Sequence, residues 1–478
     1  MGEEKILRAA TRLLAVSALI VLAAVLAGSA AATTIGSPVD VTRDSTSQNE
    51  TPLAVDPANP NIMLSGSNDW EFNDGCGMYV SVDGGATWTG ALPEGYLPGV
   101  TKFTNNPDVP GAGAYDAGGD PAVAFSPDGT KAYFVCQAFD FTPPFQIQLL
   151  LNRGTVTRTG ITWETTGLTP ISTWNGNGKT RGGNGQFPDH ESIHVDASGR
   201  IYVTWAQFDG LKGTHSPVLV ATSTDGGQTF SGPVKVTGGN IRNNQDQRIV
   251  TAPNGDAYLT FDNGVQGGKG TVLYVSKSTD GGATWSTPIQ FAALNDPVCI
   301  FPPFCFNISG GQFRAGGTYP SPAFDALRNR LVVAYADINP LFGQIYVTSA
   351  SASDLTDWTA PVAIAPAAAD QFAGELGIAP NGRYDVSFND REYTLNQLVD
   401  LTYATSSDAG ATWSHFRVST AGFDPSLWGV PSSTAPFRPF IGDYNAIVST
   451  NAFAGMAWTG VAPPQPFNLE VYFAKATP

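Results

Sequence analysis

The sequence predicts an all-β protein that folds as a single β-propeller of seven four-stranded blades. An eight-residue phrase typical of a hairpin tip recurs along the chain, and an apolar strand–turn–strand pattern recurs seven times. The 478 residues include 53 Gly and 35 Pro and are only 14% charged, which excludes coiled coils and long helices. A closed ring of small antiparallel sheets accounts for all of this, because closure protects the sheet edges.

The recurring phrase is S-x-D-x-G-x-T-[WF], which we call the box. Copies start at residues 81, 156, 223, 278, 351 and 406, a spacing of 55 to 75 residues. The copies at 156 and 351 keep the final Trp but lack the Asp at the third position. An Asp side chain can accept hydrogen bonds from backbone N–H groups of a turn, and Gly supplies the positive φ that a tight turn needs. Each box therefore predicts the tip of a β-hairpin.

The Thr and the aromatic residue at the end of each box begin the returning strand. There the aromatic ring can wedge into the core between neighbouring sheets. We assign purely structural roles to the third and last positions of the four complete boxes, which are Asp83, Trp88, Asp225, Phe230, Asp280, Trp285, Asp408 and Trp413.

Seven repeating units give the number of blades. Each unit opens with an apolar strand, a turn and a second apolar strand, and the units start near Asn49, Asp120, Asp189, Asp246, Tyr319, Phe372 and Phe440. A box follows each of the first six starts by 32 to 36 residues. The seventh box would fall near residue 472, where the chain is still in a strand. Seven blades are therefore favoured, with a six-bladed ring as the alternative if the first or last unit is irregular.

The last unit lacks a fourth strand, which the N-terminus can supply. Leu469 to Phe473 form its third strand, and the chain then ends. The segment Pro38 to Thr42 resembles Pro233 to Thr237, which follows a box and is interpreted as an outer strand. We therefore expect Pro38 to Thr42 to pair beside Leu469 to Phe473 and close the ring.

Residues 1–32 have the features of a secretory signal peptide. Basic residues precede an apolar run from Leu13 to Ala27, and small residues follow it. This run is short for a membrane span. We expect 1–32 to be removed and 33–478 to form one β-propeller domain of a secreted, extracellular or cell-surface protein. The alternative, an uncleaved anchor, would keep the protein at a membrane.

The chain has four cysteines, which could pair in three ways if the protein reaches an oxidising compartment. Cys299 and Cys305 bracket a short loop and could form a bridge, with buried free thiols as the alternative.

The charge balance excludes a nucleic-acid partner. The chain has 25 Lys and Arg against 41 Asp and Glu, a net charge of -16 that would repel a phosphate backbone. Gly178-Lys179-Thr180 resembles the end of a nucleotide-binding loop, but the leading Gly that the loop requires is replaced by Thr173. Neither nucleic acid nor a nucleotide is expected to bind.

The boxes resemble the Asp-box, or BNR, repeats of the sialidase superfamily, and this resemblance covers nearly the whole chain after residue 32. It implies a propeller whose boxes lie at the periphery, away from the substrate site. It does not imply sialidase activity, because many box-bearing proteins are not sialidases.

The sialidase site itself is altered in this sequence. The resemblance implies three arginines that bind a substrate carboxylate, a Tyr nucleophile assisted by a Glu, and an Asp as acid/base. Glu50 occupies the place of the first arginine, so the charge there is reversed. Arg248, Arg314 and Arg438 remain as ligand-binding candidates, although each can also be interpreted as an ordinary ion pair at a blade rim. An exo-sialidase is therefore not expected.

Acidic residues gather at the starts of the inner strands, which in a propeller converge on one end of the central channel. The candidate catalytic set is Glu50, Asp120, Asp189, Glu191, Asp246, Glu375, Asp443 and Tyr444. Paired carboxylates could carry out glycoside hydrolysis. They could equally hold Ca²⁺, although no dedicated metal site or other cofactor is predicted, or simply accept hydrogen bonds from backbone N–H groups. Tyr319 and Tyr444 could stack on a sugar ring.

One string in this region imitates a zinc-protease motif. His190-Glu191-Ser192-Ile193-His194 matches H-E-x-x-H, whose two histidines share one face of a helix. On a strand, however, residues four apart are separated by roughly 13 Å. A shared metal is therefore not expected.

Three functions remain open on the sequence alone. The first is a glycoside hydrolase of sialidase-like fold, and the second is a non-catalytic propeller that binds an extracellular glycan or glycoprotein. The third is a protein-interaction or envelope-structural propeller. We expect a monomer in each case.

Overall fold

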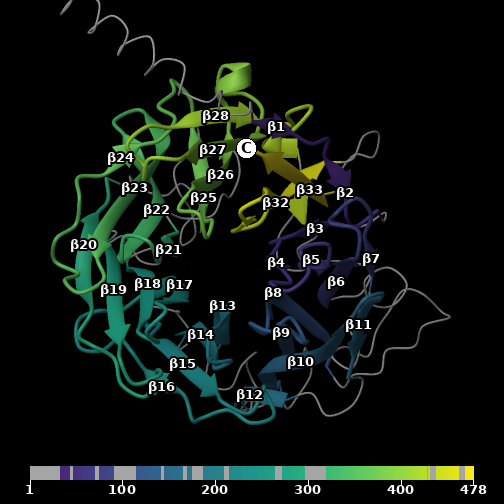
Figure 1. Ribbon diagram of the computed structural model, residues 1–478, viewed down its shortest axis with the longest axis vertical. Coiled ribbons are helices and arrows are strands. Elements are labelled where there is room, and N and C mark those ends of the chain that lie inside the picture. Colours follow the sequence, from purple (N-terminus) through teal and green to yellow (C-terminus); the bar gives the residue numbers. More distant parts are fainter. Residues whose placement is uncertain are drawn as a thin grey trace, which may run out of the picture.

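The computed structural model describes residues 33–43, 47–69, 75–90, 115–140, 145–164, 169–174, 187–208, 215–263, 272–295, 319–427, 429–430, 438–461 and 469–478. Antiparallel sheets stand around a central axis as seven four-stranded blades (Figure 1). In three of these blades, one of the four strand positions is made of two short strands that pair with the same neighbour. The seven-bladed prediction is confirmed over the six-bladed alternative. Within the described ranges, the only helices are the 3₁₀ turns η3 (Glu392–Thr394) and η4 (Pro425–Leu427).

The first four blades follow one another along the chain. Blade 1 consists of β3 (Gln48–Asn49), β4 (Leu53–Val55), β5 (Met63–Asp69), β6 (Gly75–Ser81) and β7 (Thr89–Gly90). Blade 2 consists of β8 (Ala117–Phe125), β9 (Lys131–Phe139), β10 (Ile147–Thr157), β11 (Gly160–Trp163) and β12 (Thr169–Trp174). Blade 3 consists of β13 (Phe187–Val195), β14 (Ile201–Phe208), β15 (Val218–Ser223) and β16 (Val234–Lys235). Blade 4 consists of β17 (Asn244–Thr251), β18 (Ala257–Asn263), β19 (Val272–Ser278) and β20 (Ile289–Ala293).

The remaining blades complete the ring. Blade 5 consists of β21 (Ser321–Asp325), β22 (Arg330–Asn339), β23 (Phe342–Ser351) and β24 (Val362–Ala363). Blade 6 consists of β25 (Gln371–Ile378), β26 (Tyr384–Asp390), β27 (Asp400–Ser406) and β28 (Ser414–Arg417). A small hairpin of β29 (Gly429–Val430) and β30 (Arg438–Pro439) precedes blade 7, which consists of β31 (Ala446–Ser449), β32 (Ala454–Val461), β33 (Leu469–Thr477), β1 (Thr34–Ile35) and β2 (Val39–Asp40).

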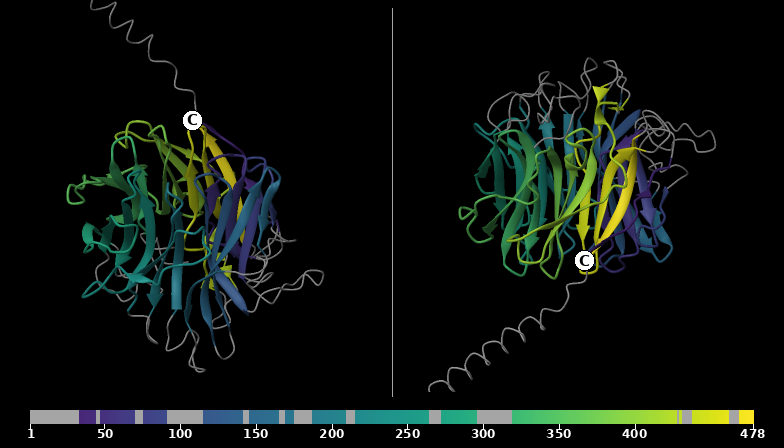
Figure 2. Two further views of the ribbon diagram at one scale, coloured as in Figure 1. Left: turned by 60° about the horizontal axis from the view of Figure 1, so that its bottom comes forward. Right: turned by 90° about the horizontal axis from the view of Figure 1, so that it is seen from above.

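The N-terminal segment closes the ring, as predicted. In β2, Val39 pairs with Phe473 and Asp40 with Tyr472 of β33. Further toward the N-terminus, Thr34 of β1 pairs with Thr477. The first and last strands therefore lie side by side in one blade (Figure 2).

The four complete boxes form the same turn. In the box at residue 278, the Ser278 hydroxyl donates to Asp280 at 2.8 Å and accepts from the N–H of Gly282 at 2.9 Å. The N–H and the hydroxyl of Thr284 both donate to Asp280, at 2.9 and 2.6 Å. The boxes at 81, 223 and 406 repeat this pattern. The box aspartates organise their turns, as predicted.

The aromatic residue of each complete box packs against the preceding blade. Trp88 is 5% exposed and meets Phe473 of blade 7 edge-on, with ring centroids 5.3 Å apart. Phe230, Trp285 and Trp413 likewise join apolar clusters that combine their own blade with the one before it. The boxes therefore fasten neighbouring blades at the periphery.

The inner strands share an irregularity at their starts. Glu50, Asp120, His190, Asp246 and Ala373 all have positive φ, between 52° and 60°. In blades 2, 3, 4 and 6 this residue coincides with a register shift. Such bulges turn a strand locally and re-aim its side chains. In blade 7 the position is Gly442, with φ of 96°, where a Cβ atom would approach the backbone nitrogen of Glu50 to 2.9 Å.

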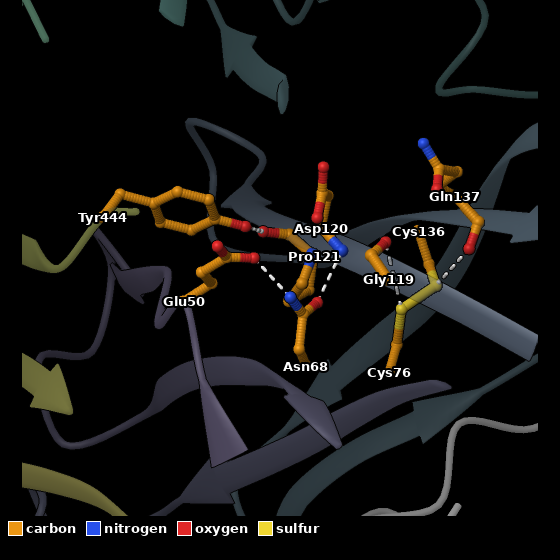
Figure 3. Close-up of a disulfide and its surroundings, with 9 residues drawn as sticks. All are labelled: Glu50, Asn68, Cys76, Gly119, Asp120, Pro121, Cys136, Gln137 and Tyr444. Carbon is orange, nitrogen blue, oxygen red and sulfur yellow. Dashed lines mark hydrogen bonds between the residues drawn. A yellow bond between two sulfur atoms is a disulfide. The ribbon is translucent and has the colours of Figure 1, made fainter. Parts of the chain in front are cut away.

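A disulfide joins blades 1 and 2. It links Cys76 of β6 to Cys136 of β9, 60 residues apart in the sequence (Figure 3). Cys299 and Cys305 lie outside the described residues, so the bridge between them stays a prediction. Residues 1–32 lie outside them as well. Over the described ranges, no helix has the length and apolar character needed to cross a membrane.

Candidate functional site

A cavity of about 210 Å³ lies where the inner strands begin. All seven blades contribute to its wall, through Pro52, Pro121, Glu191, Asp246, Ser321, Glu375 and Tyr444 among others. The strand starts singled out in the sequence therefore meet at one place, because the ring brings equivalent positions of every blade to the axis. Two cationic side chains, His190 and Arg248, line the same cavity.

His190 of β13 lies between two carboxylates from other blades. Its Nδ1 is 2.7 Å from Oδ1 of Asp246 in blade 4, and its Nε2 is 3.3 Å from Oδ2 of Asp443 in blade 7. The imidazole also contacts two aromatic rings, with centroids 5.6 Å from Tyr319 and 5.9 Å from Tyr444. The ring is thus fixed at both nitrogens and packed on its sides.

The electrostatics favour the charged form of this histidine. Burial by itself lowers the pKa of His190, but the charges of Asp246 and Asp189 and the contacts with Asp246 and Asp443 outweigh burial and raise it well above 6.5. Burial raises the pKa of Asp246, and the neighbouring imidazolium opposes that rise. The imidazolium of His190 thus favours the ionised form of Asp246, against the effect of burial.

Glu191 is the opposite case. Its side chain is buried on the cavity wall, and within the described part of the chain neither carboxylate oxygen has a hydrogen-bond partner. Burial raises the pKa of Glu191 well above 4.5, and the charges of Asp120 and Asp189 raise it further. The arrangement favours a protonated carboxyl group on Glu191, which shares the cavity wall with Asp246.

Arg248 is engaged by Glu375. Its Nη2 donates to Oε1 of Glu375 at 2.7 Å and its Nη1 donates to Oε2, and Ser321 donates to Oε2 at 3.0 Å. The arginine side chain is 27% exposed and the glutamate 4%. A carboxylate of the protein thus already occupies the guanidinium fork that a sialidase site would offer to its substrate.

Glu50 and Asp120 are held by Asn68 of β5. The Asn68 amide donates to Glu50 and accepts from the N–H of Asp120 at 2.6 Å (Figure 3). The other Glu50 oxygen accepts from the N–H of Asp443 at 3.0 Å. Glu50 therefore ties the first blade to the seventh, and this structural role explains why an acid suits a place where the sialidase resemblance implies an arginine.

Tyr444 is placed as a hydrogen-bond donor. Its hydroxyl donates to the carbonyl of Pro121 at 3.3 Å (Figure 3). Burial raises the pKa of Tyr444 well above 10, and the charges of Asp120, Glu50 and Glu191 raise it further. Forming a phenolate is therefore unfavourable, which argues against the nucleophile role that the resemblance implies for a tyrosine.

The remaining candidate site residues lie beside the cavity, in its wall or outside the described residues. Asp189 accepts from the Gln245 amide at 2.7 Å, and Tyr319 is buried in the cavity wall. Arg438 lies in β30, but its side chain is outside what the structure describes, and so is the whole of Arg314. Across the described ranges, no three His, Cys, Asp or Glu side chains are grouped so as to hold a metal ion.

His190 is the site residue that sequence reasoning missed. It belongs to the string that imitates a zinc motif, whose other histidine, His194, accepts or donates a bond with Thr251 at 2.8 Å away from the cavity wall. The alignment of His190 with acidic residues at the other strand starts was the available signal. It pointed to the cavity, although not to zinc.

Comparisons with known proteins place the fold but not the activity. No protein-family model and no curated protein matches the sequence. A protein of unknown function from Dyadobacter fermentans is 11% identical with a TM-score of 0.50, and the alignment covers 94% of this chain and 99% of that one. An ulvan lyase bound to -[GlcA(1-4)Rha3S]- is 12% identical with a TM-score of 0.50, over 91% and 95% of the two chains. A Hadza microbial sialidase is 14% identical with a TM-score of 0.46, over 88% and 74%. This chain therefore shares its propeller architecture with the protein of unknown function and with the ulvan lyase.

Proposed function

We propose that this protein is a secreted or cell-surface Asp-box propeller whose central cavity binds a neutral sugar unit of an extracellular glycan and hydrolyses its glycosidic bond. The observation that carries the proposal is Glu191, a buried cavity carboxyl whose surroundings favour the protonated form. It shares the cavity with Asp246, which the His190 imidazolium favours in the ionised form. Glycoside hydrolysis requires one protonated and one ionised carboxyl group, and of these two it is Asp246 that contacts the His190 imidazole.

Each carboxyl group has a definite role in this reaction. Glu191 is the general acid, which protonates the oxygen of the leaving group as the glycosidic bond breaks. Asp246 is the carboxylate that either activates a water or attacks the anomeric carbon. Tyr444 and Tyr319 supply aromatic surface for the sugar ring.

The charge of the cavity selects the substrate class. Seven acidic residues lie in or around it, namely Glu50, Asp120, Asp189, Glu191, Asp246, Glu375 and Asp443, against the cations His190 and Arg248. Both cations are already in contact with protein carboxylates. An anionic sugar such as a sialic acid would meet repulsion, of about 1 kcal/mol per charge at 4 Å even in bulk water. We therefore infer a neutral substrate.

The boxes and one structural comparison support a carbohydrate ligand. The recurring boxes resemble the Asp-box repeats of the sialidase superfamily. The ulvan lyase shows that a propeller of similar architecture can bind a polysaccharide.

A panel of chromogenic glycosides tests the proposal on purified protein. We expect turnover of at least one neutral glycoside, none of a sialoside, and a fall in kcat of about 10²–10⁴-fold in Glu191→Gln and in Asp246→Asn. Glu164→Gln is the matched control, because Glu164 pairs with Arg153 on the outer part of blade 2. Robust sialoside turnover that is lost in an Arg248 variant would overturn the neutral-substrate mechanism.

A non-catalytic glycan-binding propeller is the second candidate. It is favoured by the size of the cavity, because about 210 Å³ is below the ~300–1,000 Å³ of most ligand pockets. A glycan array distinguishes the two. Binding without turnover of the bound glycan, unchanged in Glu191→Gln, would establish this candidate instead. Failure to bind any glycan would leave a protein-interaction or envelope-structural propeller.

A further inference from the structure

His190 connects four blades at the cavity. Its N–H donates to Asp120 of blade 2 at 3.1 Å, and its carbonyl accepts from Gln247 of blade 4. Its side chain reaches Asp246 of blade 4 and Asp443 of blade 7. The backbone has φ of 53°, a left-handed conformation that is uncommon for histidine and needs surrounding support. The surrounding residues thus fix both the backbone and the ring.

The protonation state follows from the two carboxylates. A neutral imidazole has one N–H donor, whereas an imidazolium has two. Asp246 lies at Nδ1 and Asp443 at Nε2, so both nitrogens face an acceptor. Only the doubly protonated ring can donate to both.

We infer that His190 is a positioning residue for the proposed hydrolysis: its imidazolium, held between Asp246 and Asp443, keeps Asp246 ionised and correctly oriented on the cavity wall. This inference rests on the proposed function and adds a residue that need not contact the sugar. When His190 loses a proton, one carboxylate loses its donor. Asp246 then lies buried without the adjacent imidazolium and is expected to take up a proton, which removes the base or nucleophile.

The charged surroundings of His190 act in the same direction. The titratable groups that face it or share its cavity are Asp120 of β8, Asp189 and Glu191 of β13, Asp246 and Arg248 of β17, Tyr319, Glu375 of β25, Asp443 and Tyr444. Most of them are acids. Arg248, the cation near His190 in the described part of the chain, is paired with Glu375, so its charge is largely offset. The charges of Asp189 and Asp246 and the contact with Asp443 therefore favour a proton on His190.

Nuclear magnetic resonance of ¹⁵N-histidine-labelled protein tests the charge directly, since the chain has four histidines. We expect the His190 signal, assigned by its loss in His190→Gln, to remain that of an imidazolium well above pH 6.5. His194 is the internal control on the same strand, because burial lowers its pKa to about 4 and should keep it neutral. A His190 that becomes neutral at or below pH 6.5 would overturn the inference.

The pH profile separates positioning from a purely structural role. Asp443→Asn removes one carboxylate without altering Asp246, and should lower the pKa of His190 by ~1–3 pH units. The alkaline limb of the pH profile of kcat should move to lower pH by the same number of pH units. In His190→Gln, kcat should fall by ~10²-fold, while His194→Gln should leave it unchanged if folded. A shift of the His190 signal with no shift of the kcat limb would overturn the positioning role.

The two proposals fail separately. If the wild type cleaves no glycoside, the hydrolase and the positioning role built on it are both overturned, even where the imidazolium is found. If the wild type is active and His190 is neutral, the hydrolase stands and the inference is overturned. An active enzyme whose alkaline limb follows the His190 pKa supports both.

Discussion

The aspartates of the boxes and the carboxyl groups of the cavity are the same chemical group in opposite situations. Each complete box surrounds its exposed Asp with donors from Ser, Thr and the backbone. Those bonds lower the pKa of Asp280 and of Asp408 to about 2. In the cavity, Glu191 is buried without such donors and its pKa is raised. The carboxylates of the boxes therefore accept hydrogen bonds from their own turns, whereas the Glu191 carboxyl group in the cavity has no hydrogen-bond donor among the described residues.

This difference separates structure from chemistry. A carboxylate with a full set of donors is a fixed part of a turn and has little tendency to exchange a proton near neutral pH. A buried carboxyl without donors carries a proton that it can give to a substrate, at some cost to stability. A substitution at the periphery should therefore affect folding, and one at the centre should affect activity.

The largest expected effect comes from Glu191→Gln. It replaces the proton-bearing carboxyl with an amide of nearly the same shape, so kcat on any glycoside that the wild type cleaves should fall by about 10²–10⁴-fold. The melting temperature should stay the same or rise, because a buried ionisable group is removed. A variant that unfolds instead would show that Glu191 has a structural role, like the aspartates of the boxes.

Deletion of residues 33–43 should cause the largest loss of stability among the changes at the periphery. It removes β1 and β2, and with them the pairing of Val39 with Phe473 at the outer edge of blade 7. The exposed sheet edge should lower the melting temperature by several degrees, since each kcal/mol lost shifts a large domain by roughly 2–4 °C. Ligand binding per folded molecule should persist. An unchanged melting temperature would contradict the role of this segment in closing the ring.

A single box should matter less. Asp225→Ala removes the acceptor for the N–H and hydroxyl of Thr229 at one turn. We expect a loss of about 1 kcal/mol, comparable to the loss of a helix cap, measured by denaturant unfolding. Activity per folded molecule should equal that of the wild type. If the folded variant lost its ligand, the boxes would belong to the binding site.

The smallest effect is the pH dependence of stability, which should have opposite signs in the two regions. The lowered pKa of Asp280, about 2 against an ordinary 3.8, means that its stabilisation is complete above pH 3.8 and is lost as the pH falls toward 2. The raised pKa values of Glu191 and His190 mean that stability declines as the pH rises above 4.5 and 6.5 respectively. Melting curves across this range check both signs, and Glu191→Gln should flatten the decline that begins near pH 4.5. A decline unchanged in that variant would contradict the raised pKa.

The fold could be predicted from the sequence because it is repetitive. Spacing and turn chemistry are local properties, so the boxes and the strand starts gave seven blades and even the pairing of Pro38 to Thr42 with the last blade. The convergence of the acidic strand starts followed from the ring. Local sequence therefore contained the architecture and the place of the cavity.

The pairing of side chains within the cavity could not be predicted. Arg248 and Glu375 are 127 residues apart, and a bulge on each strand start decides which side chains meet. His190 looked like half of a zinc motif because its partners, Asp246 and Asp443, come from other blades. Sequence identified the acids, but only the three-dimensional ring shows that Asp246 contacts His190 while the Glu191 carboxyl group has no hydrogen-bond partner among the described residues.

Infrared difference spectroscopy of wild type against Glu191→Gln tests the central claim most directly, because it needs no knowledge of the substrate. At neutral pH the wild type should show the carbonyl stretching band of a protonated, buried carboxyl group, and Glu191→Gln should lack it. Asp225→Ala should retain it, since its box carboxylate is ionised in the wild type. Absence of the band from the wild type at neutral pH would show that Glu191 is ionised, and would contradict the assignment of this residue as the acid of the site.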